Sequence, residues 1–316
     1  MAEKMRATRD GAGDGMLELA KAMPEVVALT GDMAGSTRTD KFEKLFPDRF
    51  FNMGIAEQDL IGTAAGLALA GKVPYACSFS SFILCRALDQ IRVSVCYNNA
   101  NVKIVGTHSG ITVGPDGATA QMLEDIALMR VLPNMCVLVP SDAEEARKAV
   151  VAAASWKGPV FIRVGRNPAP AVTAVPDTFG IGKANLLARG NDVTIVACGI
   201  MVRDALDAAA ELAQKGVGAD VINMHTIAPL DAATLLASVE KTGAAVTAEE
   251  HQLAGGLGGA VAECLAANFP VPVEMIGIAG VFGESGESDE LKLKYGLTKE
   301  KIVEACLRSI GRKGRA

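Results

Sequence analysis

Residues 51–71 of the chain read FNMGIAEQDLIGTAAGLALAG, in which one carboxylate, Glu57, opens a predicted helix. Acidic residues are common in the first turn of a helix because they complement its dipole, so Glu57 alone is an ordinary helix start. The rest of the helix is apolar and rich in small residues, which is typical of a helix that is buried or contacts another subunit. A carboxylate at the edge of an apolar wall is also a way to build a functional acid.

Outward from this stretch, short apolar runs alternate with segments of helical spacing. In the first half the predicted strands cover residues 25–30, 73–79, 101–106, 135–139 and 159–164. The predicted helices start at residue 55 and cover residues 80–96, 119–130 and 142–155. This alternation predicts an α/β fold with a mostly parallel sheet flanked by helices.

The pattern is interrupted once and then resumes. Residues 166–179 contain three prolines and no periodicity, which is typical of a linker. Beyond them, strands are predicted over 192–198, 219–224, 244–248 and 271–276, and helices over 202–215, 232–241, 257–267 and 298–310. We therefore predict a domain over 1–170, a linker over 171–185, and a second α/β domain with a mostly parallel sheet over 186–316.

Composition excludes several classes of function. The 316 residues carry 36 acidic and 31 basic side chains, so the net charge of −5 predicts no broad nucleic-acid surface. There is no signal-like apolar start and no apolar run of about 18 residues, so we expect neither secretion nor a membrane span. The seven cysteines form no CxxC pair, which favours buried thiols in a reducing compartment and a cytoplasmic protein.

Several polar or aromatic residues follow predicted strands of the first domain. His108 and Asp116 lie in a glycine-rich loop at the carboxyl edge of the sheet, where open α/β folds bind ligands. Phe79 and Phe82 are spaced i, i+3 directly after a strand; core packing is the default, but a flat ring could also stack there. The other candidates after strands are Asp32, Ser36 and Arg166.

Taken together, these motifs resemble a known family. GIAEQDLIGTAAGLALAG (54–71), the phenylalanine pair, VGPDGAT (113–119), EDIALMRVLPNM (124–135) and Glu249-Glu250-His251 occur in the order found in the pyrimidine-binding and C-terminal domains of transketolases. The similarity covers nearly the whole chain. It is strongest to the C-terminal subunit of a split, two-chain transketolase, with deoxyxylulose-phosphate synthase a more distant relative.

The resemblance implies thiamine diphosphate chemistry with Mg²⁺, in which a two-carbon ketol unit passes from a ketose phosphate to an aldose. Glu57 matches the family glutamate that contacts the aminopyrimidine ring and activates the cofactor. Phe79 and Phe82 match the aromatic wall around that ring, where Cys85 replaces a third aromatic, and Asp32 matches a position near the cofactor. The residues that match sugar and phosphate contacts are Arg9, Ser36, His108, Asp116 and Arg166.

Two departures from the family pattern matter. The family usually has histidine where this chain has Ala120, which removes a hydrogen-bond partner for the donor and leaves open an unusual ketose, such as a branched or sulfonated one. The Gly-Asp-Gly motif for Mg²⁺ appears only as Gly13-Asp14-Gly15, without a preceding strand or following asparagines, so we interpret it as coincidence. We expect no metal ligands here and a second chain, the N-terminal diphosphate-binding subunit, in an α₂β₂ assembly with a self-dimer.

Two alternatives remain at this point. One is a β-type subunit of a 2-oxoacid dehydrogenase, which shares the fold and the Glu-Gln pair. The other is a non-catalytic regulatory partner, with Ala120 as the first sign of lost chemistry. An ion pair of Glu57 within its own chain, with no space beside the two phenylalanines, would count against any role in cofactor activation.

Overall fold

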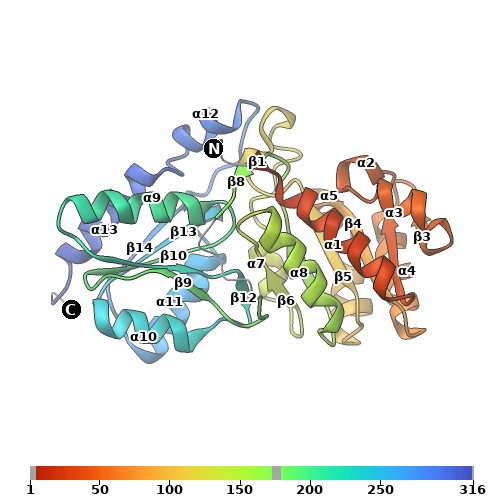
Figure 1. The fold of residues 1–316 in the computed structure, drawn as a ribbon, viewed down its shortest axis with the longest axis horizontal. Coiled ribbons are helices and arrows are strands. Elements are labelled where there is room, and N and C mark those ends of the chain that lie inside the picture. Colours follow the sequence, from red (N-terminus) through yellow and green to blue (C-terminus); the bar gives the residue numbers. More distant parts are fainter. Residues whose placement is uncertain (1–4, 173–178, 315–316) are drawn as a thin grey trace.

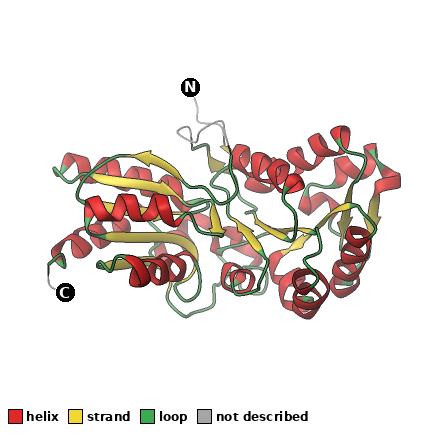
Figure 2. Ribbon diagram, turned by 90° about the horizontal axis from the view of Figure 1, so that it is seen from below, coloured by secondary structure: helices red, strands yellow, loops and turns green. Residues whose placement is uncertain are grey.

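The computed structural model describes residues 5–172 and 179–314 and contains two large sheets, each covered by helices on both faces (Figures 1 and 2). The short strands β1 and β8 form a separate antiparallel pair. The first sheet has seven strands in the order β12-β6-β7-β5-β4-β2-β3, and all its pairs are parallel except β12 with β6. The second has the order β14-β13-β10-β11-β9, with only β9 antiparallel. The predicted α/β class with mostly parallel sheets is confirmed.

The elements of the first half are bounded as follows. Its strands are β1 (Met5–Arg6), β2 (Val26–Thr30), β3 (Phe50–Asn52), β4 (Val73–Phe79), β5 (Lys103–Thr107), β6 (Cys136–Leu138), β7 (Val160–Arg163) and β8 (Ala169–Pro170). Its helices are α1 (Thr8–Ala22), α2 (Ala34–Thr37), α3 (Asp40–Leu45), η1 (Pro47–Arg49), α4 (Glu57–Leu69), α5 (Ser80–Arg86), α6 (Leu88–Gln90), η2 (Ile91–Tyr97), η3 (Ile111–Asp116), α7 (Asp125–Arg130) and α8 (Ala143–Ser155).

The second half continues the alternation. Its strands are β9 (Asn185–Ala188), β10 (Val193–Ala197), β11 (Ala219–Asn223), β12 (Thr226–Ala228), β13 (Ala245–Gln252) and β14 (Val273–Ile278). Its helices are α9 (Met201–Gln214), α10 (Ala232–Thr242), α11 (Leu257–Asn268), α12 (Ser288–Lys294) and α13 (Lys299–Gly311). No helix in the described ranges has both the length and the apolar content to cross a bilayer.

The central strands of the first sheet are buried on both faces. Every residue of β2, β4 and β5 is buried, which is why these strands read as continuous apolar runs rather than as alternating ones. Helices α1 and α8 cover one face, and α4, α5 and η2 cover the other. The sheet is therefore rigid, and side chains at its carboxyl edge are held in place by a packed scaffold.

Two local predictions differ from the structure, and part of a third lies outside the described residues. The helix expected over 119–130 begins only at Asp125, because residues 117–124 pair with the preceding loop, with Gly110 N–H bonded to Met122 O. The single helix expected over 80–96 is divided into α5, α6 and the π-helix η2. Of the predicted linker 171–185, residues 173–178 lie outside the described residues. The domain boundaries themselves stay a prediction.

The two halves share structure. Strand β12, which follows β9, β10 and β11 of the second sheet in the chain, adds to the edge of the first sheet beside β6 (Figure 1). Val139 N–H donates to His225 O at 2.8 Å, and Gly199 N–H donates to Val139 O at 3.2 Å. The carboxyl edge of the second sheet is thus bonded to the first half of the chain.

Candidate active site

Four neighbouring parallel strands bring the predicted residues to one edge of the first sheet. In the sheet, β2, β4, β5 and β7 lie side by side. Asp32 follows β2, Phe79 ends β4, His108 follows β5 and Arg166 follows β7. Because the carboxyl ends of parallel strands share an edge, the four segments open onto the same surface, as expected of a ligand site in an α/β sheet.

His108 occupies a strained position at the centre of this edge. Its φ is +56°, a left-handed conformation that non-glycine residues seldom adopt and that often marks functional sites. Arg9 Nη1 donates to its Nε2 at 3.3 Å, so its Nδ1 bears the proton and donates to Thr107 Oγ1 at 3.0 Å. Burial, together with the charges of Arg9, Arg166 and Arg38, lowers the pKa of His108 to about 3. The imidazole is therefore neutral at physiological pH.

Arg9 reaches this point from α1. Its Nη1 also donates to Ser36 O at 3.0 Å, while its buried Nε has no hydrogen-bond partner. Burial and the nearby Arg38 and Arg166 lower the pKa of this guanidinium. A half-buried cation with an unused donor, repelled by two further cations, favours binding of an anion.

Arg166 and Asp116 form a second polar pair. Arg166 Nη1 donates to Asp116 Oδ1 at 2.7 Å and to Val113 O at 3.2 Å, and about a third of each side chain is exposed. The pair fixes the far end of the 108–117 loop beside the arginines. Two of the predicted substrate residues are thus in direct contact with each other.

The two predicted phenylalanines contact each other, and their role as a wall around a cofactor ring stays a prediction. The Phe79 and Phe82 rings lie 5.2 Å apart between centroids and 22° from parallel, and the Phe79 ring stacks on His108 at 3.5 Å. Phe79 is buried and Phe82 is half-buried. A continuous row of contacts therefore runs from Ser36 through Arg9, His108 and Phe79 to Phe82.

Glu57 lies at the other end of this row, and its carboxylate is already paired. Its side chain is only 6% exposed, and Oε1 accepts a hydrogen bond from Arg86 Nη1 at 2.7 Å. The Arg86 guanidinium also lies over the Phe82 ring, 4.3 Å from its centroid. Arg86 thus forms the ion pair that is the first part of the condition against a role for Glu57. The Arg86 side chain is 48% exposed, and ion pairs of exposed side chains contribute little stability.

Asp32 stands apart from the row. Its φ is +62°, its N–H donates to Asn52 Oδ1 at 3.0 Å, and its carboxylate accepts from Asn52 Nδ2 at 3.3 Å. Its role beside a cofactor stays a prediction.

Sequence reasoning misses two residues of this edge. Arg86 has the sequence context of an ordinary solvated or paired arginine, since nothing in its spacing points to Glu57. Arg38 belongs to no motif; it has φ +64° and donates to Asp10 Oδ1 at 2.7 Å. Both lie on or beside helices whose orientation must be known before the contacts can be inferred.

Within the described ranges no three His, Cys, Asp or Glu side chains gather in a way that could hold a metal ion. The Gly13-Asp14-Gly15 segment lies inside α1, where Asp14 pairs with Arg6. A Gly-Asp-Gly motif that binds Mg²⁺ needs its aspartate in a loop at a sheet edge, so its placement in a helix fits the interpretation as coincidence.

Comparison with known proteins places this geometry in a family. The model for the transketolase pyrimidine-binding domain matches residues 4–170, and the model for the transketolase C-terminal domain matches residues 182–302. The chain belongs to the transketolase family. It is 45% identical to the 6-deoxy-6-sulfo-D-fructose transketolase subunit SqwH of a Clostridium species, over 94% of this chain and 92% of that protein.

Other relatives agree with a split transketolase. A subunit of the apulose-4-phosphate transketolase of Phocaeicola vulgatus is 42% identical over 97% of this chain and 98% of that protein. A solved split-gene transketolase, described as an inactive β4 tetramer, superimposes with a TM-score of 0.89 at 48% identity, covering 97% of this chain and 99% of that one. The predicted transketolase subunit is confirmed, and the 2-oxoacid dehydrogenase alternative is not favoured.

Proposed function

We propose that this chain is the pyrimidine-binding subunit of a two-chain transketolase, active only with a partner chain that supplies the diphosphate and Mg²⁺ site. The donor would be a ketose with an anionic end, and the acceptor an aldose. The observation that carries this proposal is the unbroken row of contacts from Ser36 to Glu57 along one sheet edge. One end of the row suits an anion, and the other suits a flat ring with N–H donors.

The Arg86 contacts support the fit of an aminopyrimidine to the second end. A guanidinium is planar, cationic and an N–H donor, and it stacks readily on aromatic rings. Arg86 donates a hydrogen bond to the Glu57 carboxylate and also lies over the face of the Phe82 ring. These are the two groups that the cofactor ring would contact. Thiamine diphosphate, when bound, would supply the carbon nucleophile and electron sink of ketol transfer. Glu57 would hold the ring nitrogen, and Arg86 would turn outward.

The opposite end of the row is suited to the donor's anionic group. Arg9 and Arg166 are the cations, and Arg9 Nε is an unused donor beside them. Neutral His108 would contact a sugar hydroxyl or a phosphate oxygen, and Asp116 would accept hydrogen bonds from hydroxyls. Ala120 is buried, its N–H donates to the carbonyl of Gly117, the residue after Asp116, and its side chain offers no polar group. The proposal is therefore compatible with donors such as the 6-deoxy-6-sulfo-D-fructose and apulose-4-phosphate in the names of the relatives.

We propose that a partner chain supplies the Mg²⁺ ligands; among the described residues no group of three or more His, Cys, Asp or Glu is placed to hold a metal ion. The exposed side of α4 and η2 is a candidate for contact between copies: Ile55, Leu69, Val93 and Tyr97 are exposed there. The tetramer of the split-gene relative consists of β subunits, which supports self-association of this chain as well. We propose an α₂β₂ assembly.

The experiment that tests the proposal is reconstitution with the diphosphate-binding subunit from the same organism, thiamine diphosphate and Mg²⁺. Ketol transfer from phosphorylated, sulfonated and branched ketoses is compared with turnover of pyruvate. The proposal expects transfer from at least one anionic ketose, which Glu57→Gln abolishes and Asp59→Asn, an exposed neighbour on the same helix, leaves intact. Turnover of pyruvate alone would overturn it, and cofactor binding without any turnover would favour the non-catalytic alternative.

A further inference from the structure

The 108–117 loop, which carries His108 and Asp116, is held by two side chains of the second half of the chain. Thr112, at its centre, donates its N–H to Glu250 Oε1 at 2.6 Å. The carbonyl of the same residue accepts a hydrogen bond from Ser288 Oγ at 2.8 Å. The backbone N–H and C=O of Thr112 are therefore both bonded to the C-terminal half of the chain. Glu250 belongs to β13 and Ser288 to α12.

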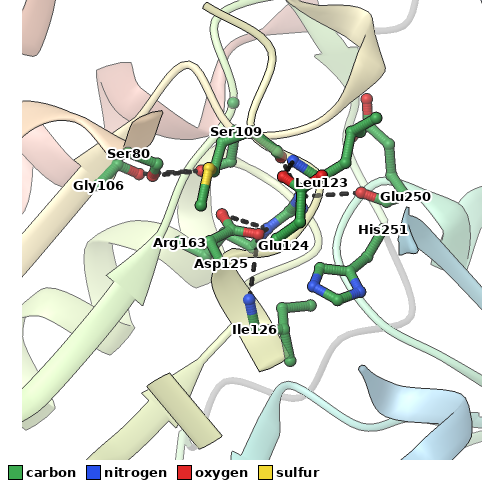
Figure 3. Close-up of polar contacts among 12 residues, drawn as sticks. Ser80, Gly106, Ser109, Leu123, Glu124, Asp125, Ile126, Arg163, Glu250 and His251 are labelled. Atoms are coloured by element: carbon green, nitrogen blue, oxygen red, sulfur yellow. Dashed lines mark hydrogen bonds and ion pairs between the residues drawn. The ribbon is translucent and has the colours of Figure 1, made fainter. Parts of the chain in front are cut away.

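Glu250 is buried, and its negative charge is offset by a neighbouring network (Figure 3). Arg163 Nη2 donates to the backbone carbonyl oxygen of Glu250 at 2.8 Å, and Arg163 Nε pairs with Asp125 Oδ2 at 2.9 Å. Burial raises the pKa of Glu250, while Arg163 and the Thr112 N–H oppose that rise. The Glu250 backbone is thus bonded to the first sheet through Arg163, while its carboxylate accepts from the loop at Thr112 N–H.

The loop is shaped to receive this carboxylate. Gly110 has φ +89°, and a side chain there would meet the Glu250 carboxylate, whose atoms lie 2.2–2.4 Å from the position a Cβ would take. Only glycine permits both the backbone conformation and the close approach. The fit between Gly110 and Glu250 is as specific as the hydrogen bond to Thr112.

The loop that Glu250 and Ser288 hold at Thr112 is also bonded to the predicted substrate residues. Val113, directly after Thr112, accepts from Arg166 Nη1 at 3.2 Å, and the same guanidinium nitrogen pairs with Asp116. On the other side, Ser109 Oγ contacts Ser80 Oγ at 2.7 Å beside β5 (Figure 3). A shift of Thr112 would therefore move Arg166 and Asp116 while the strand end at His108 stays fixed.

We propose that Glu250, assisted by Ser288, is a positioning residue for the donor site: the C-terminal domain sets the geometry of the 108–117 loop and so the affinity for the anionic ketose. The expected change in donor KM rests on the proposed function. The expected change in the mobility of the loop does not depend on it. Glu250 touches neither donor nor cofactor; it acts through Thr112. The C-terminal domain thus has a defined part in substrate binding although it supplies none of the predicted contact residues.

The test uses Glu250→Ala and Glu250→Gln in the reconstituted complex. Loss of the acceptor in Glu250→Ala should raise KM for the ketose donor about tenfold, with the thiamine diphosphate Kd, measured by calorimetry, within about twofold. Glu250→Gln keeps an oxygen for the Thr112 N–H and should restore most of the affinity. The matched control is Glu249→Gln, an equally buried neighbour that instead accepts from Leu257 and Gly258 N–H of α11.

Amide hydrogen exchange of this chain gives the readout that needs no turnover. Peptides spanning 108–117 should exchange faster in Glu250→Ala than in the wild type, and at the wild-type rate in Glu249→Gln. Unchanged exchange in a folded Glu250→Ala would overturn the inference, as would faster exchange with an unchanged donor KM. A KM that rises only in step with the cofactor Kd would also overturn it.

Ser288→Ala provides the answer if Glu250→Ala does not fold, because Ser288 is only half-buried and its loss leaves no buried charge. It should raise the donor KM about threefold and speed exchange of the same peptides; no change in either would overturn the inference. If the wild-type complex turns over no anionic ketose, the proposed function fails, and the exchange experiment still decides whether Glu250 holds the loop.

Discussion

The carboxyl edges of the two sheets are built alike but differ in how their polar groups are satisfied. At the first edge, Asp32 and His108 have positive φ, and Arg9 Nε is the one buried atom of a charged side chain, among the described residues, that lacks a hydrogen-bond partner. At the second edge, the charged residues Glu249 and Glu250 and the neighbouring His251 are buried and hydrogen-bonded. The atoms that lack a partner there, Asn223 Oδ1 and His225 Nε2, belong to an amide and an imidazole. No non-glycine residue in the described part of the second half has positive φ.

The difference shows that position at a sheet edge does not by itself make a binding site. The second edge packs against the first half, and its charged groups are used to hold β13, α11 and the 108–117 loop in place. The first edge has positive-φ residues after two of its strands and a buried guanidinium donor without a partner, features that often mark ligand sites. The comparison can be tested by changing one group at a time at each edge.

The largest effect is expected for Glu57→Gln at the first edge. Because a positioned acid typically contributes factors of hundreds to thousands, the rate of ketol transfer should fall about a thousandfold. Steady-state kinetics of the reconstituted complex measure this, with Asp59→Asn as the exposed control on α4. An activity within about tenfold of the wild type would show that Glu57 is not the activating acid.

A second large effect concerns Glu145, which links the first half to the second edge. Its Oε2 accepts from Ser141 N–H at 2.6 Å and its Oε1 from Asn223 Nδ2 at 2.8 Å, yet burial raises its pKa from 4.5 to about 7. The folded state therefore keeps a proton that the unfolded state has lost, and stability falls as pH rises from about 4.5 to about 7.

The size of this fall is about 3 kcal/mol when the pKa difference is converted to free energy. Denaturant unfolding at several pH values should show that the wild type loses this amount relative to Glu145→Gln across the window. Glu144→Gln, on the exposed side of the same helix turn, should leave the wild-type slope unchanged. Parallel pH profiles for the wild type and Glu145→Gln would contradict the assignment.

How much of this comparison is visible in the sequence depends on the kind of residue. Continuous apolar runs predict the buried strands, with β4 matched at both ends, and the family motifs single out Glu57, Phe79, Phe82, His108 and Arg9 before any contact is known. The contacts from Arg9 through His108 and the phenylalanines then bring these residues together. Site residues that follow parallel strands can therefore be predicted from the sequence, because the sheet topology brings the ends of those strands to one edge.

What the sequence cannot supply depends on packing between distant segments. Helix α1 is not predicted, since its three glycines oppose helix formation; at Gly11 a Cβ would lie 1.7 Å from Ala143 O, so glycine is required for α1 to pack against α8. The pairing of Arg86 with Glu57 and of Glu250 with Thr112 likewise joins residues 29 and 138 positions apart. Such contacts leave no periodic signal.

At the anion end of the first edge, Arg9→Ala should raise KM for a phosphorylated donor about tenfold to thirtyfold, because a charge-assisted hydrogen bond is lost. An unphosphorylated ketose should lose much less. Arg308→Ala in the second half, which removes an exposed pair with Glu274, serves as the control. Equal losses for both donors would show that Arg9 holds the loop rather than the anion.

The smallest effect is expected for Arg86→Met. Removing a half-exposed ion pair and a cation–π contact frees the Glu57 and Phe82 surfaces at a gain of about 1 kcal/mol. The thiamine diphosphate Kd of the reconstituted complex should fall about fivefold by calorimetry. A weaker cofactor affinity in this variant would mean that Arg86 assists the ring instead of competing with it.

The claim on which all of this depends is that the first edge is one half of a cofactor site completed by another chain. It is tested most directly by calorimetric titration of thiamine diphosphate with Mg²⁺ into this chain alone, into the diphosphate-binding subunit alone, and into their mixture. We predict saturable, tight binding only in the mixture, weakened by Phe82→Ala on this chain. Binding of equal affinity to the isolated partner, or no effect of Phe82→Ala, would contradict the account.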